Sequence, residues 1–272
     1  MHRPVAAAAA FLALSLSLPL AAQWDEFPPL SPGAAAAPKA EGPRPLEMSG
    51  QLAPPQCPQA AYTFTYKVVF PQGFDGGPVD AAILVRARAF HEESKETWET
   101  DYASSQGACD RVAPPHRTVS GTPFRASPKL AGVMWGWEEF YGGNHPGWGY
   151  VSQNMTAEDG TELTLGRLFP NFRDSLFQLW GIVYRGFCSQ GKDTTPSFYG
   201  SQPCRKRPPR APEQLSEPGN TLDAAGHAIL SPQGLHFHLD PYEGYFWADG
   251  PKFLDIPKEK LLEIGADRLL LP

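Results

Sequence analysis

Cysteine and charge are both scarce in this sequence. Four of the 272 residues are cysteine, and no two of them have the Cys-x-x-Cys spacing of common structural zinc sites. Charged residues make up 19% of the chain, and the 23 Lys and Arg are outnumbered by the 29 Asp and Glu. The formal net charge of −6 argues against nucleic acid as a partner and is compatible with a basic protein partner.

Long apolar runs are few as well, because only the start of the chain contains one. The segment of residues 1–4 is short and basic, and residues 5–22 are rich in Ala and Leu. The apolar segment ends in two small residues, Ala21 and Ala22. This order predicts a secretory signal peptide over residues 1–22. The alternative is an uncleaved membrane anchor, since such a run just reaches across a bilayer core of about 30 Å. Two serines and a proline inside the run weaken that alternative. We therefore expect a periplasmic or secreted protein.

The even number of cysteines fits export. Exported proteins commonly pair their cysteines, and four cysteines allow three connectivities. We predict that Cys188 pairs with Cys204, because the proline-rich residues between them lack a core of their own. The second predicted pair is Cys57 with Cys109. We expect no cofactor.

Composition divides the rest of the chain. Residues 23–58 contain nine prolines and no periodic apolar pattern, which predicts a disordered or extended linker. We expect a smaller N-terminal subdomain over 59–130. A C-terminal domain over 131–272 would carry a proline-rich insertion at 188–219.

Apolar periodicity predicts the main elements. Residues 62–70 alternate in polarity like a half-buried strand, and residues 78–99 carry apolar residues at helical spacing. A second helix is marked by Leu176, Trp180, Val183, Tyr184 and Phe187. Further strands are predicted at 134–141, 149–155, 235–240, 245–248 and 252–256, with a short helix from Pro257. Hairpin connections dominate, so the predicted class is α+β, with a mostly antiparallel sheet, two main helices packed on it and two subdomains.

Common catalytic motifs are missing. The sequence contains no Gly-x-Ser-x-Gly elbow, no His-Glu-x-x-His helix and no glycine-rich phosphate loop. Glu138 and Glu139 are adjacent in a predicted strand, so their side chains point to opposite faces and cannot act as an acid/base pair. We therefore expect a protein that is not an enzyme.

The nearest approach to a metal site is formed by His236, His238 and Asp240. Strand geometry places these side chains on one face, about 6 to 7 Å apart along the strand. Such a group could share a metal ion, although no fourth ligand can be identified. The simpler alternative is that a half-buried strand shows polar residues on its solvent face. We expect no metal.

Aromatic residues gather around a glycine-rich loop. Trp135 and Trp137 share one face of a predicted strand, which favours the core for both. Trp148 is the better candidate for the surface. Exposed Trp and Tyr commonly line interfaces, because they supply rigid apolar area with a polar group.

The same loop carries a resemblance to a known family. The run Phe140-Tyr141-Gly142-Gly143-Asn144-His145-Pro146, followed by Asp159-Gly160, Leu163-Thr164-Leu165 and Leu168-Phe169, resembles the RsiV-like extracytoplasmic domain. The end of the chain is similar to the Pro-Tyr-Glu, Ala-Gly and Ile-Pro signature of that family: Pro241-Tyr242-Glu243, Ala248-x-Gly250-Pro251 and Ile256-Pro257. The upstream residues 62–98 look like the smaller subdomain that usually precedes this domain.

The resemblance implies a bacterial envelope protein of mostly unassigned function. The namesake of the family is a membrane anti-sigma factor whose outer domain binds lysozyme, and other members accompany a polysaccharide deacetylase domain. This sequence departs from both, because few residues precede its apolar run and we expect no room for a deacetylase. Asn144 also replaces the usual Ala, and the insertion at 188–219 is unusual.

We expect a non-catalytic binding module for an extracytoplasmic protein such as lysozyme or for a cell-wall glycan. The candidate binding residues are Tyr141, Gly142, Gly143, Asn144, His145, Trp148, Tyr150, Tyr242 and Glu243. A structural alternative for the loop is that its glycines serve only a tight chain reversal. A functional alternative is an enzyme that acts on envelope glycans or peptides, centred on His145 or on the His236 face.

Overall fold

The computed structural model describes residues 44–52, 61–70, 74, 76–97, 115–140, 146–191, 193–240 and 252–271. The predicted signal peptide, the predicted Cys57–Cys109 pair and the predicted strand at 245–248 lie outside these residues. Tyr141 to His145, Tyr242 and Glu243 do so too. No helix of the described part is long and apolar enough to cross a membrane.

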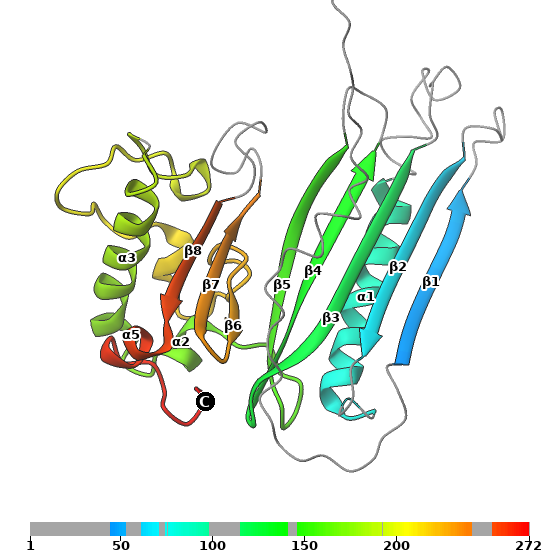
Figure 1. Cartoon of the computed structure of the whole chain (residues 1–272), viewed down its shortest axis with the longest axis horizontal. Coiled ribbons are helices and arrows are strands. Elements are labelled where there is room, and N and C mark those ends of the chain that lie inside the picture. Colours follow the sequence, from blue (N-terminus) through cyan, green and yellow to red (C-terminus); the bar gives the residue numbers. More distant parts are fainter. Residues whose placement is uncertain are drawn as a thin grey trace, which may run out of the picture. The chain divides into compact units, whose positions relative to one another are not determined.

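Two sheets and two main helices make up the fold (Figure 1). The strands are β1 (Arg44–Leu52), β2 (Tyr62–Phe70), β3 (His116–Ser127), β4 (Leu130–Phe140), β5 (Gly147–Thr156), β6 (Ile229–Ser231), β7 (Gly234–Leu239) and β8 (Lys252–Pro257). The helices are α1 (Pro78–Thr97), α2 (Leu165–Leu168), α3 (Phe172–Cys188), α4 (Glu213–Ser216) and α5 (Lys258–Glu263), with a 3₁₀ turn at Ser197–Tyr199.

The pairing of the strands confirms the predicted class. The larger sheet has the order β1-β2-β3-β4-β5, and the smaller has the order β6-β7-β8. Every pair is antiparallel except β2 with β3, which are joined through α1. The protein is therefore α+β with mostly antiparallel sheets. The larger sheet includes strands from both predicted subdomains, and the boundary between them stays a prediction.

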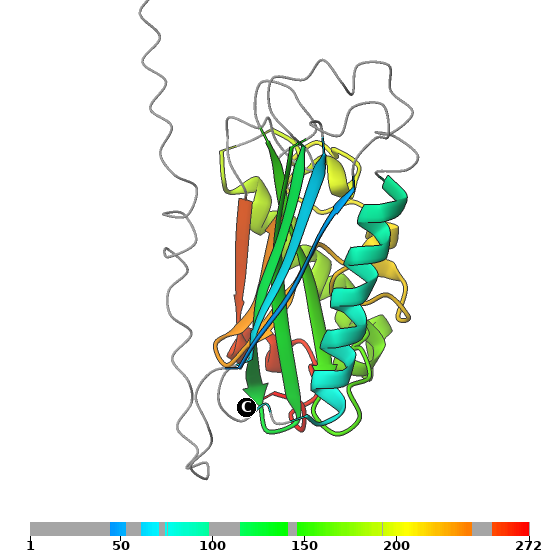
Figure 2. The ribbon, with the colours of Figure 1, turned by 90° about the vertical axis from the view of Figure 1, so that its right-hand side faces the viewer.

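The first core lies between α1 and one face of the larger sheet (Figures 1 and 2). The predicted alternation of β2 is confirmed, because its even-numbered residues are buried and its odd-numbered residues face away from this core. Trp135 is fully buried and its ring meets Phe90 of α1 edge-on at 5.3 Å. Trp137 packs partly buried against the same cluster. The assignment of both tryptophans to the core is thus confirmed.

The second core joins α3 and α5 to the smaller sheet. α3 buries Trp180, Tyr184 and Phe187, three of the residues that predicted it. The indole N–H of Trp180 donates to the Pro209 carbonyl at 2.9 Å, so the helix also holds the proline-rich segment that follows it. The predicted disulfide between Cys188 and Cys204 is confirmed and ties the end of α3 to this segment.

β1 was not predicted, because the prolines around it dominate the composition of 23–58. Leu46, Met48, Gly50 and Leu52 nevertheless recur at every second residue, which is the period of a strand. Gly50 is required where it stands, since a Cβ there would lie 2.2 Å from the ring of Phe64 on β2. Residues 44–52 of the predicted linker therefore belong to the larger sheet.

β3 was also missed, although it is the central strand of the larger sheet. Its sequence alternates poorly and contains Pro123, which normally excludes a central strand. The register explains the exception. β3 pairs with β2 only as far as Gly121, so the proline lies beyond that pairing and faces Val133 of β4.

Candidate functional site

β5 carries the two predicted binding residues that the structure describes. Trp148 lies opposite Glu138 in the register with β4, and Tyr150 lies opposite Gly136. Both side chains point to the face of the sheet opposite Trp135 and Trp137. Their partners in β4, Glu138 and Gly136, alternate with those two tryptophans along the strand. Trp148 and Tyr150 are half-buried.

The outer edge of β5 is closed by side chains that come from far along the chain. The backbone N–H of Tyr150 donates to Asp240, and the N–H of Ser152 donates to Asp223 at 2.7 Å. Two residues further on, the amide of Asn154 donates to the Ala228 carbonyl and accepts from the Leu230 N–H, both at 2.8 Å. An open strand edge invites unwanted pairing, and here polar side chains occupy it. These contacts join the larger sheet to β6 and β7.

An aromatic platform lies beside this edge, formed by Trp148, Tyr150, His238 and Phe253. The ring of Tyr150 lies 6.1 Å from Trp148 and 5.1 Å from His238, between centroids. His238 in turn meets Phe253 edge-on at 4.9 Å. Phe253 is 46% exposed, whereas His238 is only 3% exposed. The structure therefore brings together two regions that the sequence singled out separately, the end of the glycine-rich loop and the histidine strand.

Burial fixes the protonation of the platform. Desolvation, followed by the nearby His236 and His227, lowers the pKa of His238 to about 3, so this imidazole is neutral at physiological pH. Desolvation and the charge of Asp240 raise the pKa of Tyr150. The four rings are thus uncharged at neutral pH.

The residues of the proposed metal face have separate partners. His236 contacts Asp255 at 2.6 Å and Ser231 at 2.7 Å through its two ring nitrogens. His238 packs between rings, and Asp240 binds the backbone of β5. Among the described residues, no group of three His, Cys, Asp or Glu side chains is arranged to hold a metal ion.

The alternative interpretation of these residues, a solvent-facing polar side of β7, is wrong for His238 and Asp240. They are only 3% and 7% exposed, because Tyr150 and Phe253 cover the first and the edge of β5 binds the second. β7 is buried on both faces except at His236.

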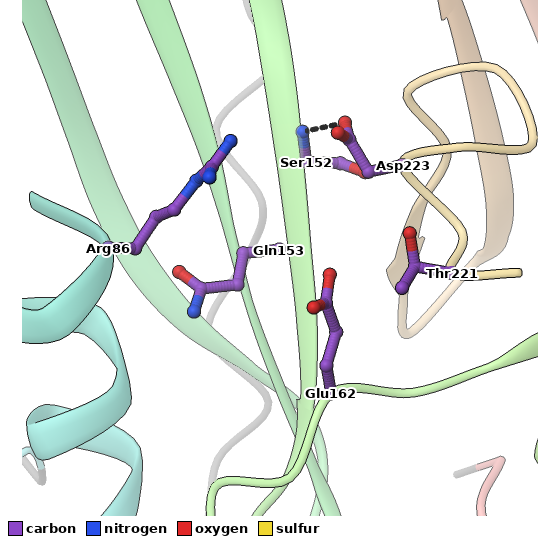
Figure 3. A pocket seen from close by; sticks show the side chains of 6 residues that line it. All are labelled: Arg86, Ser152, Gln153, Glu162, Thr221 and Asp223. Atoms are coloured by element: carbon purple, nitrogen blue, oxygen red, sulfur yellow. Dashed lines mark hydrogen bonds between the residues drawn. The ribbon is translucent and has the colours of Figure 1, made fainter. Parts of the chain in front are cut away.

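A small polar pocket lies further along β5, at Ser152 and Gln153 (Figure 3). Its volume is about 230 Å³, and it is lined by Arg86, Ser152, Gln153, Glu162, Thr221 and Asp223. Arg86 comes from α1, and Glu162 follows the turn after β5. Desolvation raises the pKa of Glu162, and the negative charge of Asp223 raises it further, against the opposing effect of Arg86.

The pocket wall around Asp223 is held by a tight turn. One carboxylate oxygen of Asp223 contacts both the Ser152 N–H and Nδ1 of His227, the latter at 2.9 Å. His227 has a φ of 47°, a left-handed conformation that a residue with a Cβ seldom adopts. The preceding Gly226 has no room for a side chain, since a Cβ would lie 2.3 Å from the Tyr199 hydroxyl. The turn and these two contacts thus leave the Asp223 side chain little rotational freedom.

Sequence reasoning missed this pocket. Its residues come from a helix, a strand edge, a turn and a loop, with up to 137 positions between the first and the last. No spacing in the sequence links them. Asp223 and His227 give a local signal in the sequence, because a carboxylate and an imidazole four residues apart can contact each other within a turn.

Comparison with known proteins relates the chain to others at the level of structure. No protein-family model matches the chain, and no curated protein sequence matches it. A DUF3298 family member from Bacteroides fragilis has a TM-score of 0.49 and 13% identity, covering 83% of this chain and 93% of its own. A DUF3298 family protein from Pseudomonas aeruginosa PAO1 has a TM-score of 0.48 and 12% identity, covering 85% and 98%. DUF3298 is the RsiV-like domain, and these two bacterial proteins are what the chain is similar to in structure.

Proposed function

We propose that this protein is a non-catalytic binding module of an extracytoplasmic compartment and that its ligand is a cell-wall glycan. The observation that carries the proposal is the aromatic platform of Trp148, Tyr150, His238 and Phe253. Aromatic rings offer rigid apolar area to the faces of sugar rings, and their polar atoms can pair with hydroxyl groups. The platform is uncharged at neutral pH, which suits a ligand recognised through stacking.

Polar groups beside the platform support a glycan. In the register of the larger sheet, Glu138 stands next to Trp148, and Thr118 of β3 stands next to Glu138. These side chains share one face of the sheet, opposite the face that α1 covers. Carboxylates and hydroxyls are the partners that sugar hydroxyls require. A row of one aromatic and two polar side chains therefore extends from the platform across β5, β4 and β3.

The compartment is inferred from two features. The confirmed Cys188–Cys204 disulfide is of a kind that persists in oxidising environments. The first 22 residues have the pattern of a secretory signal. Both support a periplasmic or secreted protein.

A basic protein such as lysozyme is the second candidate ligand, and the observation that favours it is charge. The net charge of −6 would speed the encounter with a basic partner and make the binding sensitive to salt. Such a complex would weaken markedly between low and physiological salt. Binding of a neutral glycan by stacking would change little over the same range.

Calorimetric titration of the mature protein separates these functions. Soluble peptidoglycan fragments should bind, lysozyme should bind more weakly at physiological salt, and chromatography after long incubation should recover the fragments uncleaved. Cleaved fragments would favour the enzyme alternative. Binding of lysozyme without binding of the fragments would show that the ligand is a protein and not a glycan.

A further inference from the structure

The small polar pocket on β5 offers opposite charges on its two sides (Figure 3). The guanidinium of Arg86 enters from α1. The carboxylates of Glu162 and Asp223 lie on the other side, from the turn after β5 and the loop before β6. Amide and hydroxyl groups of Gln153 and Thr221 complete the lining. An arrangement of this kind matches a ligand that carries a positive and a negative group on a short frame.

One hydroxyl at the pocket wall is buried without a partner in the described part of the chain. Ser152 lines the pocket and is 2% exposed, and its hydroxyl has no hydrogen-bond partner among the described residues. A buried hydroxyl without a partner costs free energy, because it has lost its hydrogen bonds to water.

The charged groups are held in place by their neighbours. Arg86 stacks its guanidinium 4.6 Å above the ring of Phe90 and lies 3.8 Å from Glu93. Asp223 is fixed by the Ser152 N–H and by His227. Gln153 is anchored by Trp135 and by the Ala82 carbonyl. Since these contacts already order the side chains, little rotamer freedom remains to be lost when a ligand binds.

The volume limits the size of the ligand. About 230 Å³ is below the range of roughly 300–1,000 Å³ that pockets for drug-sized molecules occupy. The pocket therefore suits a molecule of few heavy atoms.

We propose that this pocket binds a small zwitterion of the α-amino acid class, free or at the end of a short peptide. Arg86 pairs with its carboxylate, and Glu162 and Asp223 pair with its ammonium group. The polar side chains of Gln153 and Thr221, which also line the pocket, complete the hydrogen bonds of the bound molecule. This site is separate from the aromatic platform, with which it shares no residue.

Titration of the full mature chain with D-alanine and L-alanine tests the proposal, with ethylamine and propionate as probes that carry one charge each. At least one enantiomer of alanine should bind about tenfold or more tightly than either singly charged probe, because both charged walls contribute. Equal affinity for ethylamine and alanine would overturn the proposal, since the site would then recognise a cation alone. The absence of binding by both enantiomers would overturn it as well.

Two charge-removing variants and their matched controls complete the test. Arg86→Gln and Glu162→Gln should each weaken alanine binding by about tenfold or more. Arg88→Gln and Glu158→Gln remove the same charges from exposed positions that do not line the pocket, and should leave the affinity unchanged. Thermal melts should show all four variants folded. Equal losses in a pocket variant and in its control would contradict the assignment.

Discussion

Both carboxylate oxygens of Asp240 accept the backbone N–H of Tyr150, at 3.0 and 3.1 Å. The two residues are 90 positions apart, and their contact locks the end of β7 to the edge of β5. It also holds the backbone of Tyr150 close to β7, where the Tyr150 ring contacts His238. The stability of this contact can be measured without knowledge of the ligand.

Asp240→Ala should lower the free energy of unfolding by about 1–3 kcal/mol, because it leaves the Tyr150 N–H without its acceptor in a half-buried position. Urea denaturation measures the change. Asp255→Ala is the matched control, since the carboxylate of Asp255 is 72% exposed and its pair with His236 should contribute at most about 1 kcal/mol. A control that costs as much as Asp240→Ala would refute the role of the contact.

Gly149→Ala should destabilise the protein for a steric reason. A Cβ at this position would lie 1.9 Å from a carboxylate oxygen of Asp240 and 2.6 Å from the Trp137 ring, so one of these groups has to move. Overpacking of this kind typically costs about 1–3 kcal/mol. Gly147→Ala is the control on the same strand, because its nearest neighbour would be 3.7 Å away. Equal melting temperatures for the two variants would contradict the packing described.

Acid should destabilise the fold through His238. Burial lowers the pKa of His238 in the folded protein to about 3, below its ordinary 6.5, so the unfolded chain binds a proton that the folded chain does not. This contribution to stability is complete above about pH 6.5 and falls by up to about 1.4 kcal/mol per pH unit towards pH 3. His238→Gln should flatten the fall in unfolding free energy between pH 7 and pH 4. An unchanged slope would show that His238 has the same pKa in the folded and unfolded chains, which would contradict its burial.

Removal of the Cys188–Cys204 disulfide should lower the free energy of unfolding by about 3 kcal/mol. The unfolded chain then regains the conformational entropy that closure of a loop of this length removes. The double variant Cys188→Ser with Cys204→Ser isolates the effect, and chemical denaturation measures it. Reductant should lower the stability of the wild-type protein by more than that of the double variant, because the double variant keeps only the predicted Cys57–Cys109 pair. A double variant as stable as the wild type would mean that the contacts of Trp180 and Tyr184 hold the segment unaided.

The sequence predicted the elements whose apolar residues are periodic, and missed those set by tertiary context. β2, α1 and α3 were found because their buried faces repeat with the period of a strand or a helix. β3 was missed because a poorly alternating segment with Pro123 becomes central only through its register with β2 and β4. Apolar periodicity therefore predicts an element that buries one of its faces in a core. It fails for a strand such as β3, whose place in the sheet depends on pairing with its neighbours.

The candidate site shows the same division. Strand parity placed Trp135 and Trp137 on one face, and the register of β4 with β5 puts Trp148 on the other face. The neighbourhood of Trp148 could not be predicted, since it depends on Asp240 reaching an edge that lies 90 positions earlier in the chain. The pocket around Arg86 could not be predicted either, because four separate elements build it.

The most direct test of the binding function compares three variants in titrations with soluble peptidoglycan fragments. Trp148→Ala and Phe253→Ala each remove one outer ring of the platform, whereas Phe177→Ala removes an exposed phenylalanine of α3. Gln190, just beyond α3, binds the Phe253 carbonyl, so at about 1.5 Å per residue Phe177 lies roughly 20 Å away along the helix axis. The account predicts an affinity loss of about 2 kcal/mol for Trp148→Ala, a smaller loss for Phe253→Ala and none for Phe177→Ala, with little change in the thermal melts. Unchanged affinity in both platform variants, with the fragments still bound, would contradict it.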